Sequence, residues 1–243
     1  MADRRRSFQS AIRNLKSMNV LLVIAKRPAP GQTKTRLTPP LSPEQASQLY
    51  ECFLRDTLDL ARAVPGVTRL IHYAPLDAAG YFQRLAPDFG LTPQIGEDLG
   101  ERLDNVLTRC LNDGFRRAVI IDSDSPTLPA EFVGQAFAKL DDADVVLGPC
   151  DDGGYYLIGL TCLQPRLLRE VPMSTPNVLR DTLALAEQEG LRVALLPTWY
   201  DVDTVQELWR LQRELRAAAN GTAHHTRMML SGWRAGFYHK LRE

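Results

Sequence analysis

Four segments of the chain gather residue types that suit phosphate or metal binding, and each lies beside an apolar run. The first, AKRPAPGQTKTRL at 25–37, contains Gly31, Lys34 and Arg36. Backbone N–H groups of a glycine turn, together with lysine and arginine side chains, form a site for phosphate groups. The spacing matches neither the Walker A pattern nor G-x-G-x-x-G. The segment therefore predicts a phosphate site of another kind, with a solvated basic loop as the alternative.

The other three segments carry pairs of aspartates: Asp122 and Asp124, Asp151 and Asp152, and Asp201 and Asp203. Carboxylates beside phosphates are hard oxygen ligands that suit Mg²⁺ or Mn²⁺. We expect only one of Asp122 and Asp124 to face a ligand. Each pair also has a structural alternative: a turn or cap at 122–124, a hairpin turn at 151–154 and a helix cap at 203–204.

Apolar runs of strand length alternate with helical patterns along the chain. The clearest helix start is at Ser42, which is followed by Pro43 and by Gln45 in a capping box. This alternation predicts an α/β fold with a mainly parallel, Rossmann-like sheet covered by helices on both faces. Ligands bind at the carboxyl ends of such strands, where the four segments would meet. We expect strands at 19–25, 67–74, 91–96, 118–121, 143–149, 154–160 and 191–197, and helices at 42–64, 77–87, 100–115, 129–140, 175–190 and 204–219.

Composition excludes several classes of protein. The 243 residues include 29 Lys and Arg and 29 Asp and Glu, so no net charge favours nucleic acid or an acidic membrane. The four cysteines have no C-x-x-C spacing, which argues against a zinc site or a disulfide framework and favours reduced thiols in the cytoplasm. The chain lacks G-x-S-x-G, and no apolar run approaches the ~18 residues of a membrane span.

The same pattern predicts the organisation of the chain. We expect a basic N-terminal extension over residues 1–17, one domain over 18–219 and a tail over 220–243. The extension lacks the apolar core of a signal peptide. The tail has enough aromatic residues to dock as one helix, while a metal clip at His224 and His225 is disfavoured because adjacent side chains diverge. The sequence does not indicate an oligomeric state.

Five motifs give the chain a family resemblance over about residues 18–213. In order, KRPAPGQTKTRL, GEDLGERL, DSDSPTL, GPCDDGGYYLIGL and YDVDT resemble the glycosyltransferase-like family of rSAM/selenodomain-associated transferases. The resemblance implies the GT-A-type nucleotide-diphospho-sugar transferase fold. Parts of the chain are also similar to 2-phospho-lactate guanylyltransferases and molybdenum-cofactor guanylyltransferases.

The resemblance also implies roles for single residues. It implies nucleotide contacts for Ala25, Lys26, Gly31, Lys34, Arg36, Gln94, Gly100 and Arg102, the last three with Asp98 lying beside the nucleoside or the acceptor. It implies a metal ion, Mg²⁺ or Mn²⁺, on Asp124 with Asp152 or Asp203. The family usually has glycine where Asp122 stands, so Asp124 is the expected ligand of the pair. Lys34, Arg36 and Asp124 are the expected catalytic residues.

The leading functional hypothesis is a metal-dependent nucleotidyltransferase. It would couple an NTP, with GTP favoured by the guanylyltransferase similarity, to a small phosphorylated acceptor and release pyrophosphate. A glycosyltransferase with a nucleotide-sugar donor is the alternative, although a diphosphate needs less cationic cover than Lys34 and Arg36 offer. A non-catalytic nucleotide-binding protein is the third hypothesis, against which the intact acidic and basic residues argue.

Overall fold

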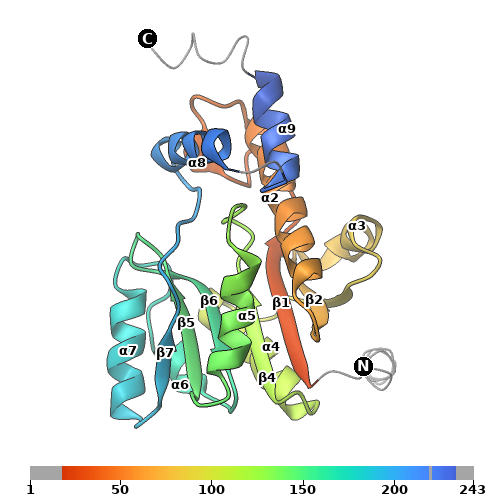
Figure 1. Cartoon of the computed structure of the whole chain (residues 1–243). Helices are drawn as coiled ribbons and strands as arrows, with labels where there is room; N and C mark the ends of the chain where they lie inside the picture. The colour runs from red at the N-terminus through yellow and green to blue at the C-terminus, as the bar shows by residue number, and fades with distance from the viewer. Residues whose placement is uncertain (1–17, 219–220, 234–243) are drawn as a thin grey trace.

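Seven strands form one mixed sheet in the computed structural model, which describes residues 18–218 and 221–233 (Figure 1). The strands follow the order β3-β2-β1-β4-β6-β5-β7 across the sheet. Strand β6 is antiparallel to both of its neighbours, and the other pairings are parallel, which confirms the predicted mainly parallel sheet. Their bounds are β1 Asn19–Lys26, β2 Thr68–Ala74, β3 Gly90–Pro93, β4 Arg117–Ile121, β5 Val145–Pro149, β6 Tyr155–Leu160 and β7 Val193–Leu195.

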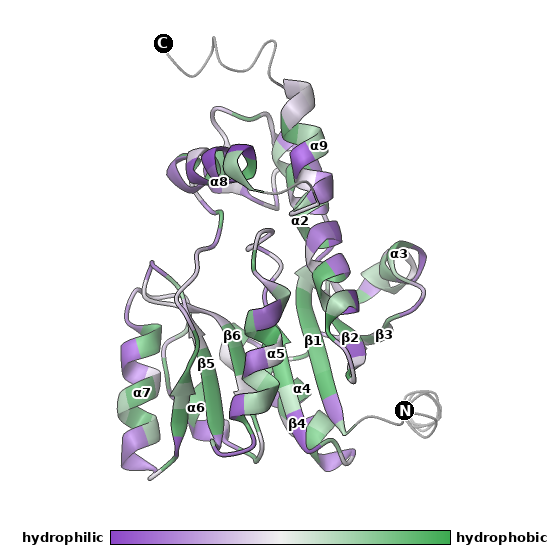
Figure 2. Cartoon of the chain, viewed as in Figure 1, coloured by the Kyte–Doolittle hydropathy of each residue, from purple (hydrophilic) through white to green (hydrophobic). Residues whose placement is uncertain are grey.

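Helices cover both faces of this sheet. Helices α2 (Pro43–Ala63), α3 (Ala79–Leu85) and α5 (Ala130–Lys139) pack on one face. Helices α4 (Leu99–Asn112), α6 (Pro165–Arg169) and α7 (Val178–Gln188) pack on the other. Figure 2 shows the hydrophobic residues concentrated on the strands between these two layers. The burial of apolar residues on both faces is what the near-continuous apolar strands predict.

Two helix starts follow from local sequence, and a third differs from the prediction. The Ser42 side chain accepts from the backbone N–H of Gln45, whose side chain caps Ser42 in return, as predicted. Thr204 and Glu207 form the same kind of box at the start of α8 (Val205–Ala217). The predicted helix start at residue 175, with Thr175 as its cap, is wrong, because α7 begins only after Asn177. The Thr175 hydroxyl instead accepts from the Asn177 N–H at 3.4 Å within a turn.

The acidic turn between β5 and β6 has the predicted hairpin geometry. It joins two antiparallel strands, and Gly153 there has a φ of 90°. A Cβ atom at Gly153 would lie 2.0 Å from the Pro176 carbonyl oxygen, so only glycine fits. The Leu179 N–H also donates to the Gly153 carbonyl, at 2.9 Å. The turn is therefore fastened to the first turn of α7 and to the segment that precedes it.

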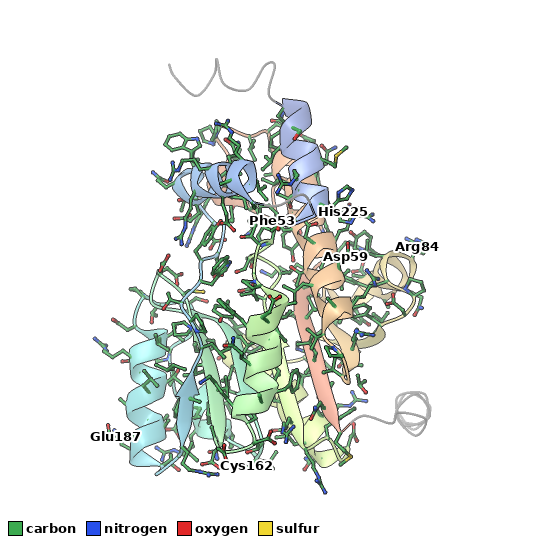
Figure 3. The ribbon with its side chains drawn as sticks, viewed as in Figure 1. Phe53, Asp59, Arg84, Cys162, Glu187 and His225 are labelled. Carbon is green, nitrogen blue, oxygen red and sulfur yellow. The ribbon has the colours of Figure 1, made fainter. Side chains whose placement is uncertain are left out.

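A third apolar cluster lies beyond the carboxyl edge of the sheet, where α8 and α9 (His224–Gly232) meet the first half of α2 (Figure 1). The Asp56 carboxylate on α2 accepts from the backbone N–H groups of His225 and Thr226, each at 2.9 Å, and so holds the start of α9. Figure 3 shows His225 beside Asp59 of α2, and their side chains lie 3.2 Å apart. The described part of the predicted tail thus docks as one helix.

Two further sequence expectations concern the ends of the chain and membranes. The predicted N-terminal extension, residues 1–17, lies outside the described residues. None of the helices within 18–218 and 221–233 has the length and apolar character needed to cross a membrane.

Burial of His72 on β2 predicts a pH dependence of stability. The residue is 1% exposed, and burial lowers its pKa from 6.5 to about 4. Between these values the unfolded chain binds a proton that the folded chain excludes, so stability decreases as the pH falls from 6.5 toward 4. At 1.36 kcal/mol per pKa unit, this group contributes about 2–3 kcal/mol to the loss between pH 7.5 and 4.5.

Urea denaturation of wild type and His72→Leu at pH 7.5 and pH 4.5 measures this contribution. We expect the variant to lose about 2–3 kcal/mol less between the two pH values than wild type does. Equal losses in the two proteins would show that His72 accepts its proton in the folded state.

Candidate functional site

The loop after β1 delivers a buried lysine to the carboxyl edge of the sheet. Gly31 has a φ of 71°, and Lys34 also has left-handed backbone, with a φ of 50°. The Lys34 side chain is only 5% exposed, and its Nζ lies 2.5 Å from Asp124 Oδ1 and 2.8 Å from Asp203 Oδ1. Burial alone lowers the pKa of Lys34, but the two carboxylates outweigh it and raise that pKa above its ordinary value. The lysine is therefore charged.

The two carboxylates come from neighbouring segments that the backbone joins. Asp124 follows β4, and the Val202 N–H donates to the Asp124 carbonyl at 2.9 Å, which aligns 201–203 beside it. The side chains of Asp124 and Asp203 are 37% and 46% exposed. Arg36 lies 3.9 Å from Asp203, with 77% of its side chain exposed. One face of this cluster of Lys34, Asp124, Asp203 and Arg36, here called the lysine–aspartate cluster, is thus open to a ligand.

A second pair of acids lies deeper than this cluster. The Asp122 carboxylate accepts from the Asp124 N–H at 3.0 Å, and burial, followed by the charges of Asp201 and Asp124, raises its pKa well above the ordinary value. Burial and then Asp124 also raise the pKa of Asp201, whose Oδ1 accepts from Ser125 at 2.7 Å and from Cys150 at 3.3 Å. Asp122 and Asp124 therefore have different surroundings. Strand alternation is not the reason, because residues two apart in a strand share a face and both aspartates lie beyond the end of β4 at Ile121; the turn after the strand separates them.

Sequence reasoning did not identify Tyr50 of α2, which lies beneath the cluster and links two strand ends. Its hydroxyl accepts from the Lys26 N–H at 3.0 Å and lies 2.8 Å from the Ser123 hydroxyl. Burial, and then the charge of Asp124, raises the pKa of Tyr50 to about 12, so it stays protonated. Tyr50 thus ties the end of β1 to the loop after β4. A tyrosine on an amphipathic helix gives no signal of such a role in the sequence.

The residues predicted beside the nucleoside or acceptor lie on the segment from β3 to α4. Gln94 is buried, and its amide donates to the carbonyl oxygens of Ala25 at 3.2 Å and His72 at 2.8 Å. The Arg102 guanidinium donates to the Gly96 carbonyl at 3.0 Å. These two side chains fix the segment 94–98 against the ends of β1 and β2.

Asp98 and Gly100 each have a structural role at the start of α4. The Asp98 carboxylate caps the helix by accepting from the Glu101 N–H at 2.8 Å. A Cβ atom at Gly100 would lie 2.0 Å from the Leu168 carbonyl oxygen, so the glycine permits close packing of α4 on α6. Asp98 remains largely exposed, so the cap uses only part of its carboxylate.

Asp152, predicted as an alternative metal ligand, lies on the exposed turn after β5. Its Oδ1 accepts from the Gly154 N–H of its own turn at 2.9 Å, while Asp124 and Asp203 share Lys34. The neighbouring Asp151 pairs with Arg210 of α8. Within the described ranges, no group of three or more His, Cys, Asp or Glu side chains is placed to hold a metal ion by itself.

Comparison with known proteins shows the family of the chain that carries this site. The model of a family described as an uncharacterized protein conserved in bacteria (DUF2064) matches residues 57–175. A 2-phospho-L-lactate guanylyltransferase from Methanothermobacter thermautotrophicus is 30% identical over 183 residues, which cover 72% of this chain and 76% of the relative. The chain belongs to the DUF2064 family and is a relative of the 2-phospho-L-lactate guanylyltransferases. This confirms the predicted resemblance to the 2-phospho-lactate guanylyltransferases.

Solved structures agree with the family and with the predicted fold. A Desulfovibrio desulfuricans G20 protein, provisionally named a nucleotide-diphospho-sugar transferase, is 32% identical, with a TM-score of 0.83 over 92% of this chain and 98% of its own. A CMP:2-keto-3-deoxy-manno-octonic acid synthetase complexed with CTP shares the fold at 12% identity, with a TM-score of 0.52 over 82% of this chain and 98% of its own. This DUF2064 protein is a transferase with the nucleotide-diphospho-sugar transferase fold.

Proposed function

We propose that this protein is a nucleotidyltransferase that joins an NTP to a small phosphorylated acceptor. The observation that carries the proposal is Lys34 Nζ lying between Asp124 and Asp203 at the carboxyl edge of the sheet. Cationic side chains stabilise the charge of a triphosphate, and carboxylates at the same point suit the metal ion that accompanies it. Two of the relatives are named 2-phospho-L-lactate guanylyltransferase, which supports GTP as the donor and a phosphate monoester as the acceptor.

The two exposed carboxylates fit a nucleotide-bound Mg²⁺ or Mn²⁺. Mg²⁺ in nucleotide enzymes is commonly held by one or two carboxylates together with substrate phosphates, so a complete protein cage is not needed. Asp124 and Asp203 would hold the ion, because both lie at the lysine–aspartate cluster and both retain exposed surface. When bound there, the ion supplies Lewis-acid stabilisation of charge on the phosphates.

The reaction asks little of the protein beyond positioning and electrostatics. An oxygen of the acceptor phosphate forms a bond to the α-phosphorus, and the bond from the α-phosphorus to the bridging oxygen of the β-phosphate breaks. Pyrophosphate leaves with that electron pair. Lys34 and Arg36 neutralise the charge that develops on the phosphates. An ionised phosphate acceptor needs no general base. The burial of His72 within the sheet agrees with this, because a buried imidazole is not available to a substrate.

Measurement of pyrophosphate release tests the proposal directly. The protein is incubated with Mg²⁺, one of the four common NTPs and 2-phospho-L-lactate or another phosphate monoester. We expect release that needs both substrates and is fastest with GTP. A thermal shift with each NTP gives a second readout, since a ligand at 100 times its Kd adds about 2.7 kcal/mol of stability. The absence of both pyrophosphate release and thermal stabilisation with every NTP would contradict the proposal.

Glycosyl transfer from a nucleotide sugar is the second candidate. It is supported by the provisional name of the Desulfovibrio desulfuricans G20 protein, which is 32% identical to this chain. The same thermal shift distinguishes the two, because stabilisation by UDP- or GDP-sugars without stabilisation by free NTPs would favour glycosyl transfer. In either case we expect a cytoplasmic protein, because all four cysteines, two of them buried, are free thiols.

A further inference from the structure

A cavity of about 400 Å³ lies between the start of α4 and the segment that follows α6. Its walls are Asp98 and Leu99 of the first side, Leu168 and Arg169 of α6, and the segment 171–174. Met173 and Leu99 belong to the apolar layer on the α4, α6 and α7 face of the sheet. The volume is in the range of small-molecule sites, which run from ~300 to ~1,000 Å³.

The chain segments that form the two walls of this cavity are held to the carboxyl edge of the sheet, where the lysine–aspartate cluster lies. On one side, Asp98 ends the segment 94–98, which Gln94 holds to the Ala25 carbonyl at the end of β1. On the other side, Pro176 lies against Gly153 of the acidic turn. The Cys150 Sγ that precedes this turn donates to Asp201 Oδ1 at 3.3 Å. The segments that carry the two walls of the cavity are thus held by short stretches of chain to the carboxyl edge of the sheet.

The charged groups of the cavity are already used by the protein. Arg169 makes ion pairs with Asp104 and Glu101 of α4 and donates to Asn105 at 2.8 Å. Glu170 is held by the Arg166 guanidinium through two contacts of 2.8 Å. Among the lining residues this leaves the exposed part of the Asp98 carboxylate and no unpaired cation. An anionic group would therefore be repelled, whereas hydroxyl groups find an acceptor.

The rim of the cavity carries local backbone strain. Ser174 has a φ of 63°, an arrangement that is costly for a residue other than glycine. Beside it, the Met173 Sδ accepts from the Tyr155 hydroxyl at 3.6 Å, which fixes an apolar side chain against the cavity. A hydroxyl-bearing side chain and an apolar surface are thus held side by side at the opening.

We propose that this cavity binds the uncharged, hydroxyl-bearing organic part of the acceptor. The proposal rests on the proposed function, in which the acceptor's phosphate attacks the α-phosphorus of a triphosphate held at Lys34 and Arg36. The apolar side chains Leu99 and Met173 contact the carbon skeleton, and Asp98 and Ser174 take hydroxyl groups. The cavity selects among phosphate monoesters by the organic group and does not bind the phosphate.

The test compares Leu99→Trp, which fills the cavity, with Leu163→Trp, which adds the same side chain at an exposed position outside it. Saturation-transfer NMR with D-glucose and with glycerol reads binding of neutral probes without turnover. We expect signals with wild type and Leu163→Trp and at least about a fivefold reduction in Leu99→Trp. No signal with wild type, or equal signals in all three proteins, would overturn the proposal. Thermal denaturation confirms that each variant is folded.

A turnover arm separates the cavity from the phosphate site. With Mg²⁺, GTP and glucose 1-phosphate, Leu99→Trp should raise the KM for the ester at least about tenfold, with kcat and the Kd of GTP within about twofold of wild type. With inorganic phosphate as acceptor, the two proteins should have the same KM. A KM unchanged for the ester would overturn the proposal. Probe binding that Leu99→Trp removes, in a protein that releases no pyrophosphate, supports the cavity and contradicts the proposed function.

If Leu99→Trp does not fold, Asp98→Asn replaces it. Asparagine caps helices as well as aspartate does, so α4 keeps its start while the carboxylate charge is lost. We expect a decrease of at least about threefold in the affinity for D-glucose. An affinity equal to that of wild type would overturn the assignment of Asp98 to hydroxyl binding.

Discussion

Replacement of Lys34 by methionine is expected to reduce pyrophosphate release by about 10²–10³-fold, the usual cost of removing one group that stabilises transition-state charge. Methionine keeps much of the length and the apolar stem while removing the charge from the lysine–aspartate cluster. The Lys34 side chain is 5% exposed and touches both carboxylates, so no neighbouring side chain can take its place without moving. Initial rates at saturating Mg²⁺ and GTP measure the effect.

The same variant should bind Mn²⁺ more tightly when no nucleotide is present. In wild type, Nζ lies 2.5 Å from Asp124 and 2.8 Å from Asp203 and neutralises the two proposed metal ligands. Its removal frees Asp124 and leaves Asp203 only the more distant Arg36, and we expect about a tenfold lower Kd for Mn²⁺, equivalent to ~1.4 kcal/mol. Isothermal titration calorimetry, which measures the heat of binding, or electron paramagnetic resonance, which measures free Mn²⁺, gives the Kd. Lys34→Arg, which keeps the charge, is the control, and an unchanged Mn²⁺ affinity in Lys34→Met would contradict the shared site.

Asp124→Asn is expected to abolish turnover while leaving the fold nearly unchanged. The side chain is 37% exposed, and asparagine has nearly the same shape, so the loss falls on charge. Lys34 keeps Asp203 as a partner at 2.8 Å, which limits the cost in stability to about 1 kcal/mol, the range of partly exposed ion pairs. Pyrophosphate release and urea denaturation of the same preparation measure the two quantities.

Asp203→Asn and Asp152→Asn make this test sharper, because the sequence left both residues open as the second metal ligand. Asp203 shares Lys34 with Asp124, whereas Asp152 makes its hydrogen bond inside its own exposed turn. We expect Asp203→Asn to behave like Asp124→Asn and Asp152→Asn to have a much smaller effect on the rate. The reverse order would assign the metal to the acidic turn. Turnover that survives Asp124→Asn would exclude Asp124 as a required ligand.

The positions of strands and helices were readable from sequence because each element carries its own apolar period. The direction of β6 is a different kind of information, since an apolar run such as YYLIGL is the same in a parallel or antiparallel neighbour. The local signal for an antiparallel β6 was the short acidic turn before it, which the sequence left open either as a hairpin turn or as a pair of ligand-binding carboxylates. The start of α7 could not be read because Thr175 is a good cap in sequence terms, whereas in the structure Pro176 packs against Gly153 and the helix begins at Val178.

The outline of the candidate site was predictable from the sequence, but the contacts within it were not. Parallel strands end at one edge, so charged residues after β1 and β4 had to meet, and Lys34 and Asp124 do. The sequence assigned one to phosphates and the other to a metal ion. It could not show that the opposite charges brought to one edge pair with each other. Tyr50 stayed hidden because its role depends on the crossing of α2 over two strand ends.

The third apolar cluster, in which α8 and α9 close over the first half of α2, gives the order of synthesis a consequence for activity. Lys34 leaves the ribosome early, but Asp203 follows it by 169 residues, and α9 comes later still. At ~5–20 residues per second, roughly 8 to 34 seconds separate the lysine from its second carboxylate. During that interval the loop that carries Lys34 lacks its apolar partners Leu208, Leu211 and Leu230, which have not yet been made. A growing chain therefore acquires its complete site only when nearly all of the described sequence has been made.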